Sequence, residues 1–341
     1  MEKGQFTRQE IFSQPEAWAA ALEVIHASQQ SILDLALLQN YDSLIFAGCG
    51  STYYLALAAA ALSQQLTGVP CHAFPSSELW LYPHSAYVDR KHLLVAISRS
   101  GETTETLRAC QAFLDEKRGT LLTLSCYPQM PLAKLGALNL VLPSGQEQSV
   151  AQTRAFSTLY LATVALACLW AGRTDLFTSL SLLPDVGQQV LEQAKTQAVM
   201  VGTSPSFDRF YWLGSGARYG LAAELSLKMK EMSLSHSEPF HFLEFRHGPK
   251  SMVTGSSCVL GLQSLVNARH EASVLADVAA LGGRAIDVGQ VCGISHLASG
   301  LDEIIRDVLY LPMGQLIAFE RSLYKGLNPD LPNNLDAVVI L

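Results

Sequence analysis

The residues best suited to bind an anion lie in three polar stretches, each of which follows an apolar, strand-like segment. They are residues 50–52, "GST", after the segment 43–48; residues 98–103, "SRSGET", after 93–98; and residues 148–153. Small hydroxyl side chains and free backbone amides at the amino end of a helix bind anions, and the helix dipole adds to the attraction. In a parallel sheet such loops meet beyond the carboxyl ends of the strands. The residue types and their spacing therefore predict a phosphate-binding site.

The stretch 98–103 also allows a simpler interpretation, in which Ser100 or Thr103 only caps the following helix and Glu102 favours its positive end. Two serines, a glycine and a threonine so close together exceed what a cap needs. A dinucleotide site would require Gly-x-Gly-x-x-Gly, but Tyr53 occupies the third glycine position. A Walker loop would require Gly-Lys-Ser/Thr, which the sequence lacks. The pattern favours a single phosphomonoester.

The helix-like residues 220–232 carry groups suited to proton transfer. Glu224, Lys228 and Glu231 recur at i, i+4 and i+7 and therefore share one face of the helix. The alternative is a solvated ion-pair face, but the rest of the helix is strongly apolar and a Gly-x-Gly turn directly precedes it. Downstream, His247 lies in an Arg-His-Gly-Pro turn. An imidazole that titrates near neutrality suits proton transfer to a sugar ring oxygen.

Strand-like and helix-like segments alternate along the chain, which predicts the α/β class with parallel sheets covered by helices on both faces. The turns "GCGSTY" (48–53) and "GSGARY" (214–219) share the spacing Gly-x-Gly-x-x-Tyr. A repeat of about 165 residues is too long for a solenoid, so we expect two tandem, doubly wound domains. The expected ranges are 1–39 for an N-terminal helical segment, 40–185 for the first domain, and 200–341 for the second domain with its C-terminal tail. Helices are expected at 52–66, 103–117, 155–171 and 220–232, with one or two more within 8–37.

Composition and charge restrict the classes of partner. A formal net charge of −7 argues against binding to nucleic acid or to acidic membranes. Seven scattered cysteines without a Cys-x-x-Cys pair predict buried free thiols in a reducing compartment. The first residues lack the apolar segment of a signal peptide, and the most apolar window, 159–172, is too short to span a membrane. We therefore expect a cytoplasmic protein with no nucleic-acid or membrane partner. The histidine spacings of five and six residues between 236 and 247 match no metal motif, so neither a metal nor a cofactor is expected.

Six motifs, taken in order, resemble the sugar isomerase (SIS) family. They are "CGSTYY", "ISRSGETTETL", "SVAQTRAFST", "ELSLKMKEMS", "EFRHGPKSM" and "QLIAFERSLYKGLNPDLPNNL". Within this family the chain is similar to the isomerase half of glutamine–fructose-6-phosphate aminotransferase (glucosamine-6-phosphate synthase, below called the synthase), and to stand-alone deaminases, isomerases and deglycases of phosphosugars. The resemblance starts near residue 40 and implies two flavodoxin-like SIS domains. The glutamine-hydrolysing domain is missing, so the chain is not expected to make ammonia from glutamine.

The resemblance also implies which residues bind substrate. Ser51 and Thr52 would line the sugar site, and the hydroxyls of the 98–103 stretch would hold the phosphate. Arg99 replaces a glutamine of the synthase and would add a charged contact, while Gln152 stands where the synthase has a serine that touches sugar. The full set of expected ligands is Gly50, Ser51, Thr52, Ser98, Arg99, Ser100, Thr103, Val150 and Gln152.

For catalysis, the resemblance implies that Glu231 moves a proton between C1 and C2, with Lys228 and Glu224 beside it. His247 would open the sugar ring and would come from the partner subunit of a homodimer. The synthase carries a tail lysine that forms a Schiff base, but Ala337 stands at that position here. Imine catalysis through the tail is therefore not expected.

Together these observations predict an enzyme that acts on a small 6-phosphosugar, with glucosamine 6-phosphate as the leading substrate. Ring opening and C1–C2 proton transfer would give an imine, which water would hydrolyse to fructose 6-phosphate and ammonia. The alternatives are an aldose–ketose isomerase, a deglycase for a 6-phosphorylated sugar–amine adduct, and, from another class, a non-catalytic sugar-phosphate sensor.

Overall fold

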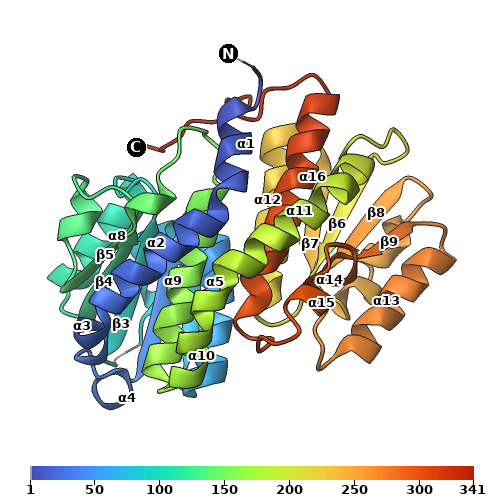
Figure 1. Cartoon of the computed structure of the whole chain (residues 1–341). Coiled ribbons are helices and arrows are strands. Elements are labelled where there is room, and N and C mark those ends of the chain that lie inside the picture. Colours follow the sequence, from blue (N-terminus) through green and yellow to red (C-terminus); the bar gives the residue numbers. More distant parts are fainter. Residues whose placement is uncertain (1, 89) are drawn as a thin grey trace. The chain divides into compact units, whose positions relative to one another are not determined.

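The structure is a computed structural model that describes residues 2–88 and 90–341 and contains two compact α/β units (Figure 1). The five-stranded unit comprises residues 14–147, 154–184 and 336–341. The four-stranded unit comprises the segment up to Ser13 together with residues 148–153 and 185–335. The chain therefore contributes to the four-stranded unit in three separate stretches.

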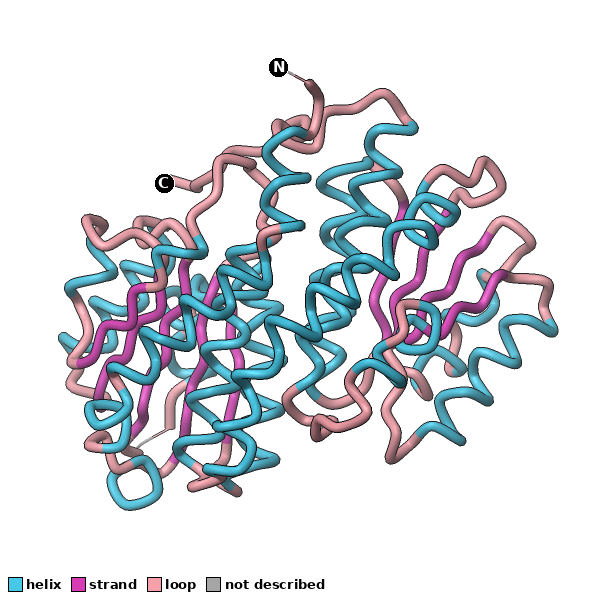
Figure 2. Tube along the Cα trace, viewed as in Figure 1, coloured by secondary structure: helices cyan, strands magenta, loops and turns pink. Residues whose placement is uncertain are grey.

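A parallel sheet with the strand order β2-β1-β3-β4-β5 forms the centre of the five-stranded unit (Figure 2). Its strands are β1 (Ser43–Gly48), β2 (Cys71–Pro75), β3 (His92–Ser98), β4 (Gly119–Ser125) and β5 (Leu138–Val141). Its helices are α2 (Gln14–Ala27), α3 (Gln29–Leu33), α4 (Leu37–Asn40), α5 (Ser51–Thr67), α6 (Ser76–Leu81), α7 (Pro83–Ala86), α8 (Thr104–Asp115), α9 (Arg154–Trp170) and α10 (Thr174–Ser179).

Helices cover both faces of this sheet. On one face, alternate residues of β1 and β3, among them Ile45 and Leu94, pack in a cluster with Phe113 of α8. The residues between them point to the opposite face, where α5 packs on β1 and β2, and α9 packs on α5. Both strands are buried at every residue, which explains their continuous apolar sequences.

The four-stranded unit contains a parallel sheet with the order β7-β6-β8-β9. Its strands are β6 (Arg209–Leu213), β7 (His236–Phe240), β8 (Ser257–Gly261) and β9 (Arg284–Asp287). Its helices are α1 (Gln5–Phe12), most of α11 (Leu183–Gly202), α12 (Ala217–Ser233), α13 (Ala268–Ala280), α14 (Val288–Val291), α15 (Ile294–Leu297) and α16 (Tyr310–Tyr324). Tyr211 and Val259 pack with Val274 of α13 in one cluster, while α12 packs on β6, β7 and α16.

The predicted fold class is confirmed: both sheets are parallel, and helices cover both faces. The orders β2-β1-β3-β4 and β7-β6-β8-β9 are the same, so the two units repeat one topology. In this doubly wound arrangement the strand order reverses between the first and third strands of each sheet, and ligands bind at the carboxyl ends beside that point. The loops after β1 and β3, and after β6 and β8, occupy these places.

The N-terminal region differs from the expectation of one or two helices within 8–37, because the chain forms α1 to α4 there. Pro15 has no amide hydrogen to continue α1, so α1 ends and α2 begins next to it. Ala36 adopts a left-handed conformation with φ of 47° and separates α3 from α4. These breaks are local and leave no mark on the apolar periodicity.

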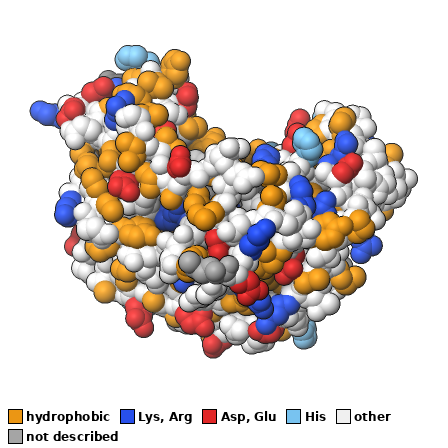
Figure 3. Space-filling view, turned by 90° about the horizontal axis from the view of Figure 1, so that it is seen from above, with side chains coloured by type: hydrophobic (Ala, Val, Ile, Leu, Met, Phe, Trp, Pro, Cys, Tyr) orange, Lys and Arg blue, Asp and Glu red, His pale blue; other side chains and the backbone are white. Residues whose placement is uncertain are grey.

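All seven cysteines are free thiols, and five of them are buried as predicted, whereas Cys49 and Cys71 are partly exposed. Within residues 2–88 and 90–341, no helix combines the length and apolar character needed to cross a membrane. On the face drawn in Figure 3, acidic and basic side chains are interspersed among apolar ones.

Candidate active site

Two glycine turns have the same geometry in the two units. Gly50 has φ 55° and ψ −122°, and Gly216 has φ 59° and ψ −134°, a backbone conformation that side chains rarely permit. The preceding glycine of each pair has a different role. A Cβ on Gly48 would lie 2.5 Å from the backbone of Thr52, and one on Gly214 would lie 2.3 Å from the carbonyl oxygen of Arg218. Glycine at both positions lets the strand pass directly into the helix.

The turn after β1 uses the Thr52 hydroxyl to close itself. Thr52 Oγ1 accepts a hydrogen bond from the Cys49 amide at 2.9 Å and lies 3.0 Å from the Cys49 carbonyl oxygen. Thr106 Oγ1 of α8 lies 3.6 Å from Cys49 Sγ and 3.2 Å from Ser76 Oγ. The loops after β1 and β2 therefore meet α8 at the carboxyl edge of the sheet, with Ser51 buried at the start of α5.

Three hydroxyl groups converge in the loop after β3. Ser98 Oγ lies 3.3 Å from Thr103 Oγ1 and 3.5 Å from Ser100 Oγ, which in turn lies 3.4 Å from Thr103 Oγ1. Thr103 holds the N-cap position of α8 but makes no side-chain cap hydrogen bond. Thr103 therefore does not cap α8 through its hydroxyl, while Ser98 Oγ and Ser100 Oγ accept hydrogen bonds from the amides of Gly101 at 3.1 Å and Glu102 at 3.3 Å. Three rotatable donors directed at one region beside a helix amino end suit the oxygens of a phosphate.

Arg99 has partners within the five-stranded unit. Its guanidinium donates to Glu147 Oε2 at 3.2 Å and to the carbonyl oxygen of Ala337 at 3.1 Å. The Glu147 side chain is fully buried and that of Arg99 nearly so. Arg99 thus connects the predicted phosphate loop to Ala337 in the C-terminal tail.

The proton-transfer group predicted on α12 is brought together in the four-stranded unit. Lys228 Nζ lies 3.2 Å from Glu224 Oε1 and also donates to Glu231 Oε2. The side chains of Glu224 and Lys228 are fully buried, whereas that of Glu231 is 17% exposed. Burial acts to lower the pKa of Lys228, but the two carboxylates outweigh it and raise the pKa above its ordinary value. A solvated ion-pair face is therefore the wrong interpretation of this helix.

A small cavity of about 10 Å³ adjoins Glu231. It is lined by Glu231, Met232, Leu234, Leu327, Asn328, Pro332 and Asn333. This volume accommodates about one water molecule, far less than a hexose phosphate. Glu231 is thus the member of the group that combines a carboxylate, partial exposure and an adjoining space.

His247 is exposed in the turn between two short 3-10 helices, η4 (Glu244–Arg246) and η5 (Pro249–Met252). Arg246 holds this turn to α13 through an ion pair with Asp277 at 2.8 Å, and the guanidinium holds the pKa of that carboxyl below its usual range. Gly248 has φ 128°, which fixes the direction of the chain after His247. His241, six residues before His247, stacks on Tyr219 with ring centroids 4.0 Å apart.

The equivalent of the phosphate loop in the four-stranded unit is occupied by carboxylates of the chain itself. The Ser264 amide donates to Glu271 at 2.5 Å and the Leu265 amide donates to Glu303 at 2.8 Å. Arg218 pairs with Glu303 and with Asp307 at 2.9 Å. Burial raises the pKa of Asp307 to about 6, although Arg218 opposes the shift. Sequence reasoning did not find this group, because its members are spread over ninety positions of the chain.

Residues 148–153, which carry Val150 and Gln152, belong to the four-stranded unit although the chain on either side belongs to the other one. The Val150 amide donates to the carbonyl oxygen of Asp330 at 3.1 Å. Gln152 Oε1 is buried and has no hydrogen-bond partner among the described residues. The expected ligands thus divide into two groups: Gly50 to Thr103 in the five-stranded unit, and Val150 and Gln152 with the α12 group in the four-stranded unit.

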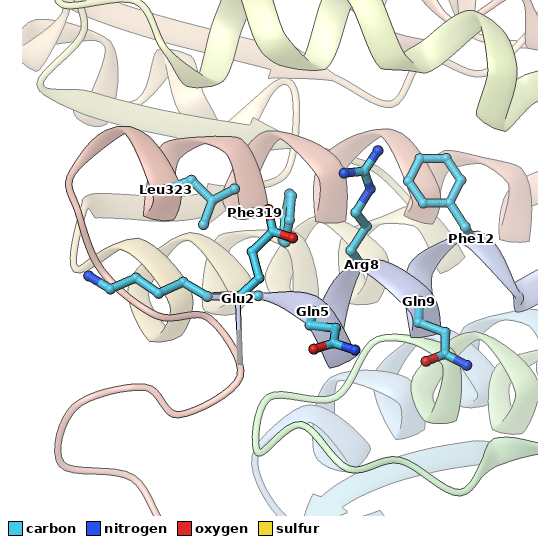
Figure 4. A pocket seen from close by; sticks show the side chains of 9 residues that line it. Glu2, Gln5, Arg8, Gln9, Phe12, Phe319 and Leu323 are labelled. Carbon is cyan, nitrogen blue, oxygen red and sulfur yellow. The ribbon is translucent and has the colours of Figure 1, made fainter.

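A wider groove of about 320 Å³ lies elsewhere in the four-stranded unit, along α1 and α16 (Figure 4). Its lining includes Arg8, Phe12 and Phe319 but none of the predicted site residues. Over the described part of the chain, no three His, Cys, Asp or Glu side chains are grouped so as to hold a metal ion.

The chain thus contains a doubly wound α/β unit with a hydroxyl-lined loop at its switch point and a second such unit that carries the buried group Glu224–Lys228–Glu231. Residues 37–169 match the family model of the SIS domain, in agreement with the resemblance that the motifs carry. The rest of the chain adds the second unit with the same strand order.

The chain is similar to glutamine–fructose-6-phosphate aminotransferase [isomerizing] of Pyrococcus horikoshii, with 28% identity over 352 residues that cover 98% of this chain. It spans 58% of the length of that relative. Among solved structures it resembles glucosamine-6-phosphate deaminase of Thermotoga maritima, with a TM-score of 0.82 and 24% identity over 98% of this chain and 99% of the other. Tagatose-6-phosphate ketose/aldose isomerase of Escherichia coli gives a TM-score of 0.83 and 22% identity over 99% and 96%. At these identities the solved structures establish the shared fold.

Proposed function

We propose that the protein is an enzyme that converts glucosamine 6-phosphate and water into fructose 6-phosphate and ammonia. The observation that carries this proposal is the group Glu224–Lys228–Glu231, in which a buried lysine joins a buried carboxylate to one that is partly exposed. Such an arrangement suits a base that must be held in one orientation while it remains accessible to substrate. The names of the similar proteins, an aminotransferase and a deaminase of hexose 6-phosphates, agree with this substrate class.

Substrate binding is assigned to the converging hydroxyls of Ser98, Ser100 and Thr103, which would donate to the phosphate oxygens. Ser51 would contribute to the sugar site, whereas the Thr52 hydroxyl is engaged with Cys49 and would act by shaping the turn. Arg99 would act through the tail, since its guanidinium already binds Glu147 and the Ala337 carbonyl.

The reaction begins with opening of the pyranose ring, for which His247 would deliver a proton to the ring oxygen. Glu231 then removes the proton from C2 of the open-chain aldehyde while O1 is protonated, which gives an enolamine. Return of the proton to C1, with loss of a proton from nitrogen that balances the one gained by O1, gives an imine at C2. Water adds to the imine carbon, the C–N bond breaks, and ammonia leaves with the ketone of fructose 6-phosphate as the second product.

Lys228 has a positioning role in this scheme. Its ammonium binds Glu231 on one side and Glu224 on the other, so the base keeps a fixed orientation through the transfer. The substrate amine itself supplies the imine nitrogen, and the route therefore requires no lysine in place of Ala337.

The homodimer is part of the proposal. His247 is exposed at the tip of a turn anchored through Arg246, which would allow it to serve the site of a second copy. In that arrangement Glu231 and His247 act on one substrate from different subunits.

Aldose–ketose isomerisation of a 6-phosphosugar is the second candidate. It uses the same ring opening and the same C1–C2 transfer by Glu231, and it needs neither an imine nor a tail lysine. The presence of Ala337 at the tail position favours both routes equally over Schiff-base chemistry. The two differ only in whether C2 carries an amine.

A panel of 6-phosphosugars, with ammonia and fructose 6-phosphate measured in coupled assays, separates the candidates. Equal amounts of ammonia and fructose 6-phosphate from glucosamine 6-phosphate support deamination. A ketose formed from an aldose 6-phosphate without ammonia supports isomerisation, and release of an amine from a sugar–amine adduct supports a deglycase. Tight binding without any product would identify a sensor and overturn the enzymatic proposal.

A further inference from the structure

Glu10 is a buried carboxylate in the first helix of the chain, and the resemblance assigns it no role. Its residue is 3% exposed, and its two oxygens accept hydrogen bonds from the loop 148–153. Glu10 Oε1 accepts from the Gln148 amide at 2.6 Å and from the Ser149 amide at 3.2 Å, while Oε2 accepts from the Ser149 hydroxyl. A carboxylate that accepts several donors in a buried place forms strong, geometrically specific bonds.

The same loop is held at two further points. The Val150 amide donates to the Asp330 carbonyl oxygen at 3.1 Å, and Gln315 of α16, itself fully buried, donates from Nε2 to the Thr153 carbonyl oxygen at 3.0 Å. Within the loop, Ser149 Oγ also lies 3.1 Å from the Ala151 carbonyl oxygen. Glu10 is the one charged side chain among these described contacts to the loop.

The helix that carries Glu10 is fastened to the segment that lines the Glu231 cavity. Asp330 Oδ1 accepts from the Thr7 amide and hydroxyl, both at 2.8 Å, and Asn328 Oδ1 accepts from the Gly4 amide at 3.0 Å. Asn328 also lines the cavity beside Glu231. The tail segment 327–333 therefore contacts α1 and the loop 148–153, and it also lines the cavity next to the proposed base.

We propose that Glu10 is a positioning residue for substrate recognition, which fixes the loop 148–153 so that Gln152 meets the sugar. Gln152 presents a buried carboxamide oxygen with no partner among the described residues. A buried acceptor of this kind requires a donor, and a sugar hydroxyl or the ammonium of an amino sugar supplies one. This role rests on the proposed function, because it takes a 6-phosphosugar as the ligand.

The negative charge of Glu10 is essential to this role. The loop offers two amides and one hydroxyl, all donors, and a carboxylate accepts from each of them. Glu10→Gln replaces the carboxylate by a neutral carboxamide with one acceptor oxygen, so the charge-assisted hydrogen bonds to the loop are lost and the Ser149 hydroxyl has to accept from the new NH2 group. The outer side of α1 is separate from this contact, since Gln9 is exposed and lines the wider groove (Figure 4).

The test compares Glu10→Gln with Glu16→Gln, which removes the same charge from an exposed position of α2. Two measurements are made: amide hydrogen exchange of the peptides that contain 148–153 and 98–103, and the dissociation constants of fructose 6-phosphate and inorganic phosphate. We expect Glu10→Gln to accelerate amide exchange in 148–153 but not in 98–103. The dissociation constant of fructose 6-phosphate should rise about tenfold. Inorganic phosphate, which has no sugar to contact Gln152, should bind as before. Ser149→Ala provides a milder second variant if Glu10→Gln does not fold.

Unchanged exchange of 148–153 in both Glu10→Gln and Ser149→Ala would overturn the proposal. The proposal would also be overturned if exchange of 148–153 became faster while the ratio of the dissociation constants of fructose 6-phosphate and inorganic phosphate stayed as in the wild type. The loop would then have no part in sugar recognition. A wild-type protein that binds no 6-phosphosugar overturns the proposed function and the substrate role of the loop together. In that case, faster exchange in Glu10→Gln would still establish that Glu10 fixes the loop.

Discussion

Glu224, Lys228 and Glu231 combine features that a surface ion pair does not have. Glu224 and Lys228 are fully buried, so each charge has lost its water and depends on the other. Their positions on one helix face follow directly from the i, i+4, i+7 spacing, and the sequence therefore predicted their proximity. The apolar neighbours of this helix also favoured burial over exposure. The sequence could not predict the contacts of Arg99, because its partners Glu147 and Ala337 are distant in sequence.

The first prediction concerns Lys228. Replacement by methionine leaves Glu224 as a buried charge without its cation, and the free energy of unfolding should fall by about 3–5 kcal/mol. Urea unfolding followed by circular dichroism measures the change. Lys230→Met is the matched control, because Lys230 is exposed on the same helix and should change stability by no more than about 0.5 kcal/mol. Equal losses in the two variants would contradict the burial of this pair.

At the scale of elements, the same Gly-x-Gly turn joins a strand to a helix in both units. The sequence predicted the repeat and the strand-to-helix transitions, because glycine spacing and apolar patterning are local properties. It also placed α5, α8, α9 and α12 to within three residues at either end. It could not predict that 148–153 associates with α1 and α16, because those hydrogen bonds join residues more than 130 positions apart.

The second prediction concerns Gly50. Its φ of 55° with ψ of −122° is unfavourable for any residue with a Cβ, and no atom lies within 4 Å of the place of that Cβ. Gly50→Ala should therefore cost about 1–3 kcal/mol through backbone strain alone. Gly300→Ala serves as the control, since Gly300 has equal space and no positive φ. Thermal unfolding distinguishes them, and a Gly50→Ala protein as stable as Gly300→Ala would refute the assigned turn geometry.

The third prediction concerns pH and the amino end of α12. Asp307 faces Arg218, Glu303, Tyr310 and Arg306, and burial raises its pKa from 3.8 to about 6. Because the folded state holds this proton more tightly than the unfolded state, stability falls as the pH rises from about 4 to about 6, by about 3 kcal/mol. Urea unfolding at several pH values should therefore give a steeper decline for the wild type than for Asp307→Asn.

Asp277 provides a control of opposite sign. Arg246 holds the pKa of Asp277 low, so its contribution is lost as the pH falls. Asp277→Asn should therefore remove stability near neutral pH and have little effect in acid. Parallel curves for the wild type and Asp307→Asn would show that Asp307 does not titrate in this range.

At the scale of the whole molecule, the two units share a topology but differ at their switch points. The five-stranded unit has converging hydroxyls there, whereas the four-stranded unit fills the equivalent loop with Glu271 and Glu303. One switch point is thus suited to bind a phosphate, whereas at the other the loop amides already donate to carboxylates of the chain itself. The repeat was visible in the sequence, but this asymmetry depends on Glu303 and Asp307, which follow the repeat motif by more than eighty residues.

The fourth prediction tests whether His247 acts across a dimer. His247→Ala and Glu231→Gln should each abolish turnover when assayed alone. When the two variants are unfolded together and refolded as a mixture, random pairing gives heterodimers in which one site is complete, so about a quarter of all sites should be active. Turnover of the mixture, with subunit exchange verified by mass spectrometry, measures this fraction. Heterodimers without activity would assign His247 to the site of its own subunit, and full turnover by His247→Ala alone would show that it has no catalytic role.

The most direct measurement is the release of ammonia and fructose 6-phosphate from glucosamine 6-phosphate by the wild type and by Glu231→Gln. The substitution preserves the size of the side chain and its place beside Lys228, but it removes the carboxylate that would move the C2 proton. The proposal predicts equimolar products from the wild type and a loss of about 10²–10⁴-fold in kcat for Glu231→Gln, with substrate binding retained. Full turnover by Glu231→Gln would contradict the assignment of the base and, with it, the proposed mechanism.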